Sequence, residues 1–259
     1  MYFDVNGTLA SPADEVVKGV AHRGYSSVAP ENTLPAYRLA KEKGFFYVET
    51  DVSFTSDGVP VCLHDATIDR TSNGTGNINS LTWAQVQTYD FGSWKSADYA
   101  GTKIPSLEQF LVLCRNIALH PYIELKNSAT YTESQIQSIV DMVEACGLKG
   151  KVTYISFSST YLGYVKAYDA SARLGYLVST MNSTAISTAQ GLQTTSNEVF
   201  IDTSATGSTA VSLCKAAHLP MEVWTIDSAS TIKGLDPYIT GVTSNELIAG
   251  RILYEEGMS

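Results

Sequence analysis

Short runs of apolar and β-branched residues alternate with longer segments of helical periodicity along almost the whole chain. Short apolar runs between turn residues are typical of buried strands, and apolar residues spaced three and four apart are typical of helices. The runs that predict strands are Val17–Ala21, Tyr47–Ser53, Val59–Leu63, Tyr122–Leu125, Val152–Ser156, Arg173–Leu177, Glu198–Asp202, Met221–Ile226 and Gly241–Thr243. The segments that predict helices are Thr33–Lys43, Ser106–Ile117, Glu133–Ala145, Tyr161–Tyr168, Thr184–Gln190, Ala210–Ala217 and Glu246–Glu255.

This alternation predicts a parallel sheet whose strands are joined by crossover helices. About eight strands in a chain of 259 residues favour a closed (β/α)8 barrel, and a doubly wound open sheet is the alternative. No linker rich in Pro, Gly or Ser divides the chain. We therefore expect one domain over residues 17–259, preceded by a polar, extended N-terminal arm over residues 1–16.

One long polar segment, at about Asp65–Pro105, interrupts the alternation. A connection of this length inside a compact domain is usually functional, and we expect a lid or binding loop. A small satellite core is the alternative, because the segment contains five aromatic residues: Trp83, Tyr89, Phe91, Trp94 and Tyr99.

Composition narrows the classes of function. With 44% apolar and 17% charged residues the chain can bury a large core, which excludes a disordered protein. Its formal net charge of −9 argues against a nucleic-acid partner, because such proteins need a basic surface. An anionic substrate would therefore need a few local cations or a metal ion.

The sequence gives no positive evidence of a transmembrane segment or of a particular compartment. No apolar run is long enough for a transmembrane segment, and the first thirty residues have no signal-peptide pattern. A chain whose leader had been removed would look the same, so the compartment stays open. The four cysteines, Cys62, Cys114, Cys146 and Cys214, lie far apart in apolar surroundings, which predicts buried thiols rather than disulfides or zinc ligands.

Ionisable residues lie at or just after the ends of the early strands. These residues are His22, Arg23, Glu49, Asp51, His64, Asp65, Glu124 and Lys126. Residues i and i+2 of a strand share a face, so Glu49 projects with Asp51 and Glu124 with Lys126. If that face is the barrel interior, three carboxylates, two imidazoles and two cations meet at the end where active sites of such barrels lie.

Each of these residues alone would more often be an ordinary polar surface residue, but the combination favours a single site. Buried charges must be compensated by a metal ion, an ion-pair network or an ionic ligand. His120 and His218 lack such neighbours, since one begins a strand and the other follows a helix, and we expect structural roles for both.

The order of these motifs resembles the glycerophosphodiester phosphodiesterases. The resemblance covers about Val17 to Arg251. The motifs that carry it are His22-Arg23-Gly24, Pro30-Glu31-Asn32-Thr33, Glu49-Thr50-Asp51-Val52, His64-Asp65, the segment Arg70 to Gly76, Ile104-Pro105-Ser106-Leu107, Ile123-Glu124-Leu125-Lys126 and Trp224-Thr225-Ile226-Asp227.

The resemblance implies a TIM barrel with a small insertion after the second strand, at about residues 65–105. It also implies an enzyme that hydrolyses small glycerophosphodiesters to glycerol 3-phosphate and an alcohol, through a cyclic phosphate formed by attack of the glycerol 2-hydroxyl. A divalent metal, Ca²⁺ or Mg²⁺, would be held by Glu49, Asp51 and Glu124. His22 and His64 would be the acid–base pair, with either one as the base.

The expected chemistry suits these residue types. Carboxylate oxygens are preferred ligands of hard cations such as Ca²⁺ and Mg²⁺. Arg23 offers a planar fork and Lys126 a point charge for phosphate oxygens. We expect Asn32 to contact substrate, with a helix N-cap role as the alternative. Trp224 is expected to line the glycerol side of the pocket, and a core tryptophan is the alternative.

Two positions depart from the family pattern. The last strand usually ends Thr-Asp-x-Pro, whereas this chain has Thr243-Ser244-Asn245-Glu246, and Asp227 replaces a common Asn. These departures put substrate preference in doubt, but not the reaction. The alternatives are a phospholipase or sphingomyelinase D-like enzyme acting on lipids, and a non-catalytic barrel that binds phosphodiesters. The leaving alcohol, the preferred metal and the oligomeric state stay open.

Overall fold

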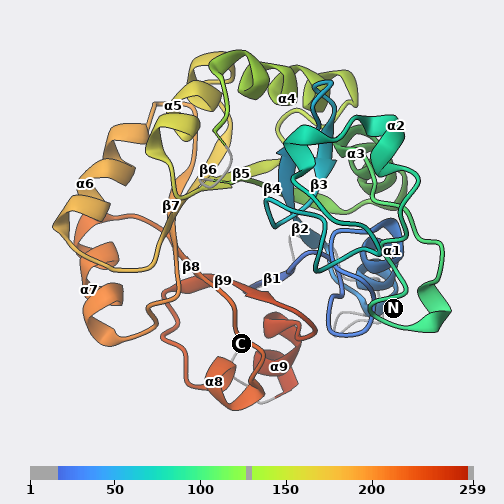
Figure 1. The fold of residues 1–259 in the computed structure, drawn as a ribbon. Coiled ribbons are helices and arrows are strands. Elements are labelled where there is room, and N and C mark those ends of the chain that lie inside the picture. The colour runs from blue at the N-terminus through green and yellow to red at the C-terminus, as the bar shows by residue number, and fades with distance from the viewer. Residues whose placement is uncertain (1–16, 127–129, 256–259) are drawn as a thin grey trace.

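The computed structural model describes residues 17–126 and 130–255, and within them eight parallel strands close into a barrel (Figure 1). The order around the barrel is β1, β2, β4, β5, β6, β7, β8 and β9, and β1 closes it by pairing with both β2 and β9. The strands are β1 (Lys18–Ala21), β2 (Tyr47–Phe54), β4 (His120–Leu125), β5 (Thr153–Ser156), β6 (Arg173–Val178), β7 (Val199–Thr203), β8 (Met221–Val223) and β9 (Ile239–Ser244). The predicted barrel is confirmed, and the open sheet is excluded.

Helices surround the barrel on its outer face (Figure 1). They are α1 (Leu34–Lys43), α3 (Leu107–Ile117), α4 (Glu133–Ala145), α5 (Ser159–Tyr168), α6 (Ser183–Leu192), α7 (Ser208–Ala217) and α9 (Ala249–Glu255), with short helices α2 (Trp83–Val86) and α8 (Ala229–Lys233). Side-chain caps fix several starts: Ser106 accepts a hydrogen bond from Gln109 N–H, and Thr132 accepts one from Gln135 N–H. The predicted helix over 246–255 is shorter than expected, since residues 246–248 are not helical and the helix begins at Ala249.

The predicted strand at 59–63 forms, but it is not a barrel strand. It is β3 (Pro60–Cys62), which pairs antiparallel with the end of β2 and so lies outside the parallel ring. The chain beyond it packs a separate apolar cluster that includes Ile68, Val86, Phe91 and Ile104. This is the satellite core that we considered as the alternative to a lid.

The aromatic residues of the insertion divide into two groups. Phe91 is buried in the satellite core, and Trp83 and Tyr89 pack against it. Trp94 is 38% exposed and lies outside that cluster. The insertion is therefore held by its own core and leaves Trp94 at its surface. The predicted N-terminal arm, residues 1–16, lies outside the described residues.

The interior of the barrel is filled by an apolar layer. Val20, Tyr122, Ile155, Leu177 and Phe200 point inward from five different strands, and each is at most 4% exposed. This layer closes the barrel below the carboxyl ends of the strands, so the space above it is a pocket and not a channel.

A buried ionic network extends this layer toward the amino ends of the strands. Glu222 is 1% exposed and accepts hydrogen bonds from Arg173, Lys18 and the Tyr122 hydroxyl, at 2.7, 3.2 and 3.1 Å. The Arg173 guanidinium also lies over the Phe200 ring, 4.1 Å from its centroid. Three donors compensate the buried carboxylate, as burial of a charge requires.

The four cysteines are buried and unpaired, as predicted. In the part of the chain that the structure describes, no helix combines the length and the apolar character needed to cross a bilayer.

We expect Arg173→Met to lower the free energy of unfolding by about 3–5 kcal/mol, because Glu222 would keep its buried charge with less compensation. The matched control is Lys215→Met, which removes an exposed ion pair with Asp236 and should cost about 1 kcal/mol or less. Urea denaturation of both variants measures the difference. Equal losses would show that Glu222 does not depend on Arg173.

Candidate active site

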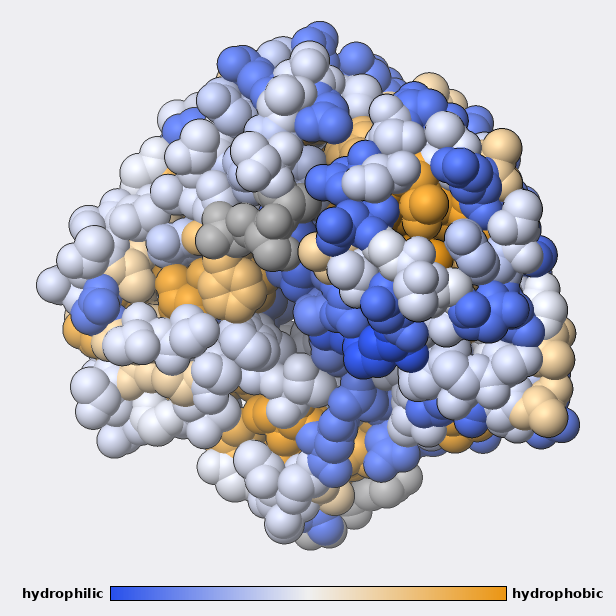
Figure 2. All heavy atoms as spheres, in the orientation of Figure 1, coloured by the Kyte–Doolittle hydropathy of each residue, from blue (hydrophilic) through white to orange (hydrophobic). Residues whose placement is uncertain are grey.

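A pocket of about 150 Å³ opens at the carboxyl ends of the barrel strands. Its lining residues are His22, Arg23, Glu49, His64, Glu124, Lys126, Ile155, Phe157, Leu177, Asp202, Trp224, Thr225 and Thr243. Figure 2 shows this face hollowed at its centre, with hydrophilic residues on the side of α1 and the insertion and hydrophobic residues opposite. Most of the predicted site residues therefore meet in one place.

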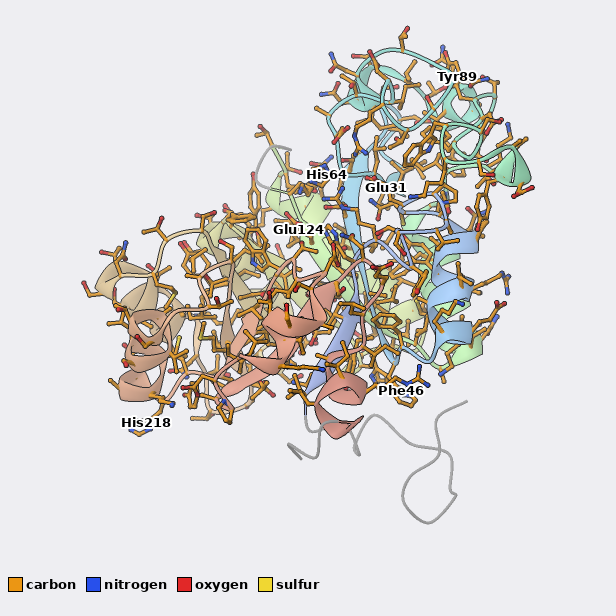
Figure 3. The ribbon with its side chains drawn as sticks, turned by 90° about the horizontal axis from the view of Figure 1, so that it is seen from below. Glu31, Phe46, His64, Tyr89, Glu124 and His218 are labelled. Atoms are coloured by element: carbon orange, nitrogen blue, oxygen red, sulfur yellow. The ribbon has the colours of Figure 1, made fainter. Side chains whose placement is uncertain are left out.

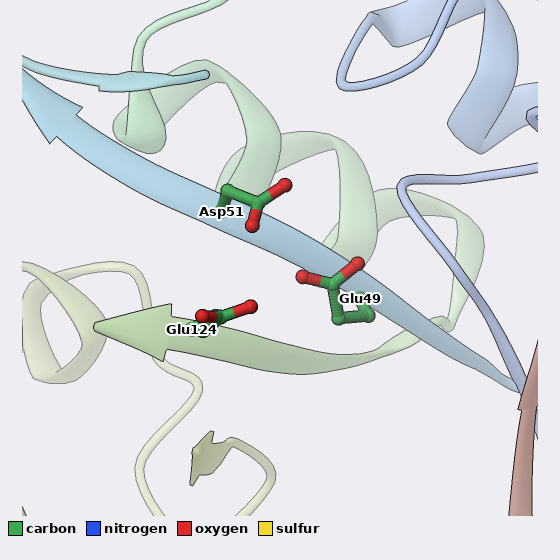
Figure 4. A group of neighbouring side chains, drawn as sticks. All are labelled: Glu49, Asp51 and Glu124. Carbon is green, nitrogen blue, oxygen red and sulfur yellow. The ribbon is translucent and has the colours of Figure 1, made fainter. Parts of the chain in front are cut away.

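Three carboxylates meet in this pocket (Figure 4). Glu49 and Asp51 share one face of β2, and Glu124 is the register partner of Asp51 on β4. One oxygen from each residue lies within 4.8 Å of the others. The same-face spacing seen in the sequence therefore brings these side chains together.

Each carboxylate keeps one buried oxygen without a well-formed hydrogen bond from the described residues: Glu49 Oε1, Asp51 Oδ1 and Glu124 Oε1. Two of these oxygens have an ionic neighbour, since Lys126 Nζ lies 3.2 Å from Asp51 Oδ1 and 3.0 Å from Glu124 Oε1. Buried carboxylate oxygens are rarely left without a hydrogen bond, and a cation is the usual partner of a group of clustered carboxylates.

The pKa values of the three carboxyl groups are shifted by their burial and by their closeness to one another. Burial and the neighbouring carboxylates raise the pKa of Glu49 well above its usual range and that of Glu124 to about 7. Burial also acts to raise the pKa of Asp51, but Arg23 and Lys126 outweigh it and lower that pKa. Arg23 and Lys126 alone therefore do not compensate three ionised carboxylates, and the oxygen-only donor set fits a hard divalent cation.

The turn after β1 places Arg23 against this cluster. Its backbone N–H donates to Glu49 Oε2 at 2.8 Å, its Nε lies 3.2 Å from Asp51 Oδ2, and its Nη1 donates to Glu31 at 2.9 Å. Gly24 permits the turn, because its φ is +82° and a Cβ there would lie 2.7 Å from the Ala36 backbone. The Arg23 guanidinium thus faces the carboxylates directly.

Asn32 holds a carboxylate in position and does not line the pocket. Its Nδ2 donates to Asp51 Oδ2 at 2.8 Å, and its Oδ1 accepts from Thr50 Oγ1 at 3.0 Å. The alternative of an N-cap role is wrong, because Thr33 occupies the N-cap of α1. Asn32 instead has a φ of +56°, which turns its amide inward toward β2.

His22 is anchored by a chain of two side chains. Its Nδ1 lies 2.8 Å from Asn245 Oδ1, and Asn245 Nδ2 donates to the Asp227 carboxylate. Because the Asn245 amide group donates to Asp227, its oxygen faces His22, so the Nδ1 of His22 is the donor. Nε2 is then the nitrogen that can accept a proton. Burial and Arg23 lower the pKa of His22, which keeps the ring neutral.

His64 is anchored by a carboxylate. Its Nδ1 donates to Asp65 Oδ1 at 2.7 Å, and Asp65 also accepts from Arg70 Nε at 2.7 Å. The hydrogen bonds from Arg70 and His64 lower the pKa of Asp65 to about 2, although partial burial opposes this shift. Arg70 in turn donates to both oxygens of Glu31, the same carboxylate that Arg23 contacts. One ionic chain thus joins His64 to the three-carboxylate cluster.

The remaining predicted residues lie as follows. Trp224 lines the pocket, and its ring packs edge-on against that of Phe157, with the ring centroids 5.7 Å apart. The buried Nε1 of Trp224 has no hydrogen-bond partner among the described residues. Figure 3 shows Glu124, His64 and Glu31 close together, and His218 at the opposite end of the barrel. His120 begins β4, with its ring 5.4 Å from that of Tyr47, away from the pocket.

Sequence reasoning missed four residues that shape the site: Asp202, Asp227, Asn245 and Arg70. Asp227 and Asn245 were visible as departures from the family pattern, and Arg70 belongs to one of the matching motifs. Asp202 gave no signal beyond its position at the end of a predicted strand.

Comparisons with known proteins identify the family to which the chain is related. Residues 22–247 match the model of the glycerophosphoryl diester phosphodiesterase family. The human "Glycerophosphodiester phosphodiesterase 1" is 41% identical over 123 residues, which cover 47% of this chain and 37% of the relative. A "Probable glycerophosphodiester phosphodiesterase 1" of Mycobacterium tuberculosis is 33% identical over 165 residues, 57% of this chain and 60% of the relative. The matches thus span less than two thirds of either relative.

Solved structures resemble the chain over nearly its whole length. A phosphodiesterase from Oleispira antarctica, solved in complex with the product sn-glycerol-3-phosphate, has a TM-score of 0.78 and 28% identity and covers 93% of this chain and 96% of that one. A glycerophosphodiester phosphodiesterase from Agrobacterium tumefaciens has a TM-score of 0.72 and 26% identity, covering 89% and 96%. The family model spans both anchored histidines and all three clustered carboxylates, and the chain belongs to the glycerophosphoryl diester phosphodiesterase family.

Proposed function

We propose that this protein hydrolyses small glycerophosphodiesters to glycerol 3-phosphate and an alcohol. The observation that carries the proposal is the pocket itself, in which Glu49, Asp51 and Glu124 meet beside His22 and His64. A phosphodiester is an anion that repels nucleophiles, so its hydrolysis needs positive charge at the phosphate and a proton donor for the leaving oxygen.

The three carboxylates would hold a divalent cation, Ca²⁺ or Mg²⁺. When bound, this ion would neutralise phosphate charge and polarise the reacting centre. Lys126 lies against Asp51 and Glu124, so its ammonium is placed beside any phosphate bound at the cluster. Arg23 would contribute positive charge on the other side of the phosphate. The attraction of both side chains for the phosphate would strengthen as negative charge builds on the phosphoryl oxygens in the transition state.

The two histidines are suited to different roles. His22 hydrogen-bonds a neutral amide and has a lowered pKa, so its Nε2 is available to take the proton from the glycerol 2-hydroxyl. His64 then protonates the leaving alcohol, with its ring oriented by Asp65. Attack by the 2-hydroxyl would give a cyclic phosphate, which water opens with the two roles reversed.

The alternatives have weaker support. An enzyme acting on membrane lipid would benefit from several exposed apolar side chains around the mouth of its pocket. Of the two insertion residues Phe91 and Trp94, however, Phe91 is buried in the satellite core and Trp94 alone is exposed. A non-catalytic barrel would be expected to lack a histidine or a clustered carboxylate, and this chain keeps all five.

We expect glycerol 3-phosphate to be released from glycerophosphocholine, glycerophosphoethanolamine and glycerophosphoglycerol with kcat/KM values within about tenfold of one another. The described pocket has no evident contact specific to one headgroup. A coupled assay for glycerol 3-phosphate measures the three rates. Cleavage of phospholipid vesicles and of none of these diesters would favour the lipid-acting alternative.

Calcium or magnesium should bind the resting protein, and Glu124→Gln should weaken that binding by tenfold or more, because it removes one anionic ligand. Isothermal titration calorimetry measures the affinity without any substrate. Asp65→Asn is the matched control, because it also removes a carboxylate, the one that anchors His64, but lies outside the three-carboxylate cluster. Equal weakening by both variants would contradict the assignment of the ligands.

Loss of the acid should matter less when the leaving group needs no proton. We expect His64→Ala to lose about a hundredfold or more in kcat on glycerophosphocholine, but much less on the p-nitrophenyl ester of glycerol 3-phosphate. His22→Ala, which removes the base, should be impaired on both substrates. The opposite pattern would exchange the two roles.

A further inference from the structure

Asp202 stands out among the residues of the pocket because nothing in the proposed mechanism uses it. It lies on β7, which is opposite β2 in the strand order of the barrel, and its side chain is 1% exposed. It lines the pocket together with Trp224 of the segment that follows β8. These two residues therefore form the wall that faces the carboxylate cluster.

Both residues have an unsatisfied polar atom. Asp202 Oδ1 and Trp224 Nε1 are buried, and neither has a hydrogen-bond partner among the described residues. A buried polar group without a partner is costly, and such groups in a pocket wall are typical of positions that a ligand completes. One of the two atoms belongs to a carboxyl group, and the other is an N–H donor.

The surroundings of this wall are apolar. Ile155, Phe157 and Leu177 line the same pocket, and the Phe157 ring packs against the Trp224 ring. The opposite wall carries Arg23, Lys126 and the three carboxylates. The pocket thus has an ionic half that suits a phosphate and a neutral half that suits carbon atoms bearing few polar groups.

The hydrogen-bonding capacity of Asp202 narrows the class of ligand further. Burial, with repulsion from Glu222 and Glu124 that outweighs the attraction of Arg173, raises the pKa of Asp202 well above its usual range. The carboxyl group of Asp202 accepts hydrogen bonds and, when it is protonated, also donates one. A hydroxyl group has the same two capacities, whereas a quaternary ammonium group offers no hydrogen-bond donor to the acceptor.

We propose that Asp202 and the indole N–H of Trp224 form a hydroxyl-binding subsite for the terminal hydroxyl of a polyol phosphate whose phosphate lies at the carboxylate cluster. The proposal deepens the proposed function and rests on it for the position of the phosphate. It places the glycerol carbons against the apolar residues, with the leaving alcohol toward the mouth of the pocket.

The test compares two ligands that differ in one oxygen atom, glycerol 3-phosphate and its analogue without the terminal hydroxyl, 2-hydroxypropyl phosphate. Calorimetry in the presence of Mg²⁺ or Ca²⁺ measures their dissociation constants. We expect the wild type to bind glycerol 3-phosphate about tenfold more tightly. Equal affinities in the wild type, or binding of neither ligand, would overturn the subsite.

Asp202→Leu should abolish this preference and leave the affinity for 2-hydroxypropyl phosphate within about threefold. Asp202→Asn keeps one donor and one acceptor and should retain most of the preference. Asp169→Leu is the matched control, because it removes another buried carboxylate at the C-cap of α5. A full preference in Asp202→Leu would overturn the proposal.

A second variant covers the case in which Asp202→Leu does not fold, as judged by its thermal unfolding. Trp224→Phe keeps an aromatic ring and loses only the N–H donor, so the preference should fall about threefold. An unchanged preference in this variant would contradict the subsite. Failure of the proposed function is distinguishable, because it would appear as no release of glycerol 3-phosphate from diesters while the binding preference persists.

Discussion

The concentration of negative charge at Glu49, Asp51 and Glu124 is the constraint on which the rest of the site depends. Three carboxylates within 4.8 Å of one another in a buried pocket repel each other strongly unless positive charge or protons compensate them. Arg23 and Lys126 supply part of that charge, and Asn32 holds Asp51 by hydrogen bonding. A bound divalent cation would supply the remainder, which makes the pocket suited to anionic ligands.

The carboxylate cluster is linked to the candidate catalytic residue His64 through a chain of side chains that contact one another. Glu31 accepts from both Arg23 and Arg70, and Arg70 fixes the carboxylate that orients His64. His22 has a separate anchor in Asn245, which Asp227 fixes in turn. The two imidazoles are therefore held by partners of different charge, and this difference supports their separate roles.

Much of the fold and part of the site could be predicted from the sequence, because the signals are local. Alternating strands and helices indicate the barrel, and the i and i+2 spacing places Glu49 beside Asp51. The antiparallel direction of β3 has no such signal. Neither does the contact of Asn245 with His22, because it arises only when barrel closure brings β9 beside β1. Asp202 is recognisable as a candidate binding residue only in the structure, where its buried Oδ1 has no hydrogen-bond partner among the described residues.

The apolar layer of Val20, Tyr122, Ile155, Leu177 and Phe200 has a kinetic consequence. Because this layer fills the barrel below the pocket, every ligand must enter and leave through the same mouth. The portion of a substrate that lies deepest is then the last that can depart after cleavage. Under the proposed function, such a site would release the leaving alcohol before the product held at the floor, and that product would compete directly with the next substrate molecule.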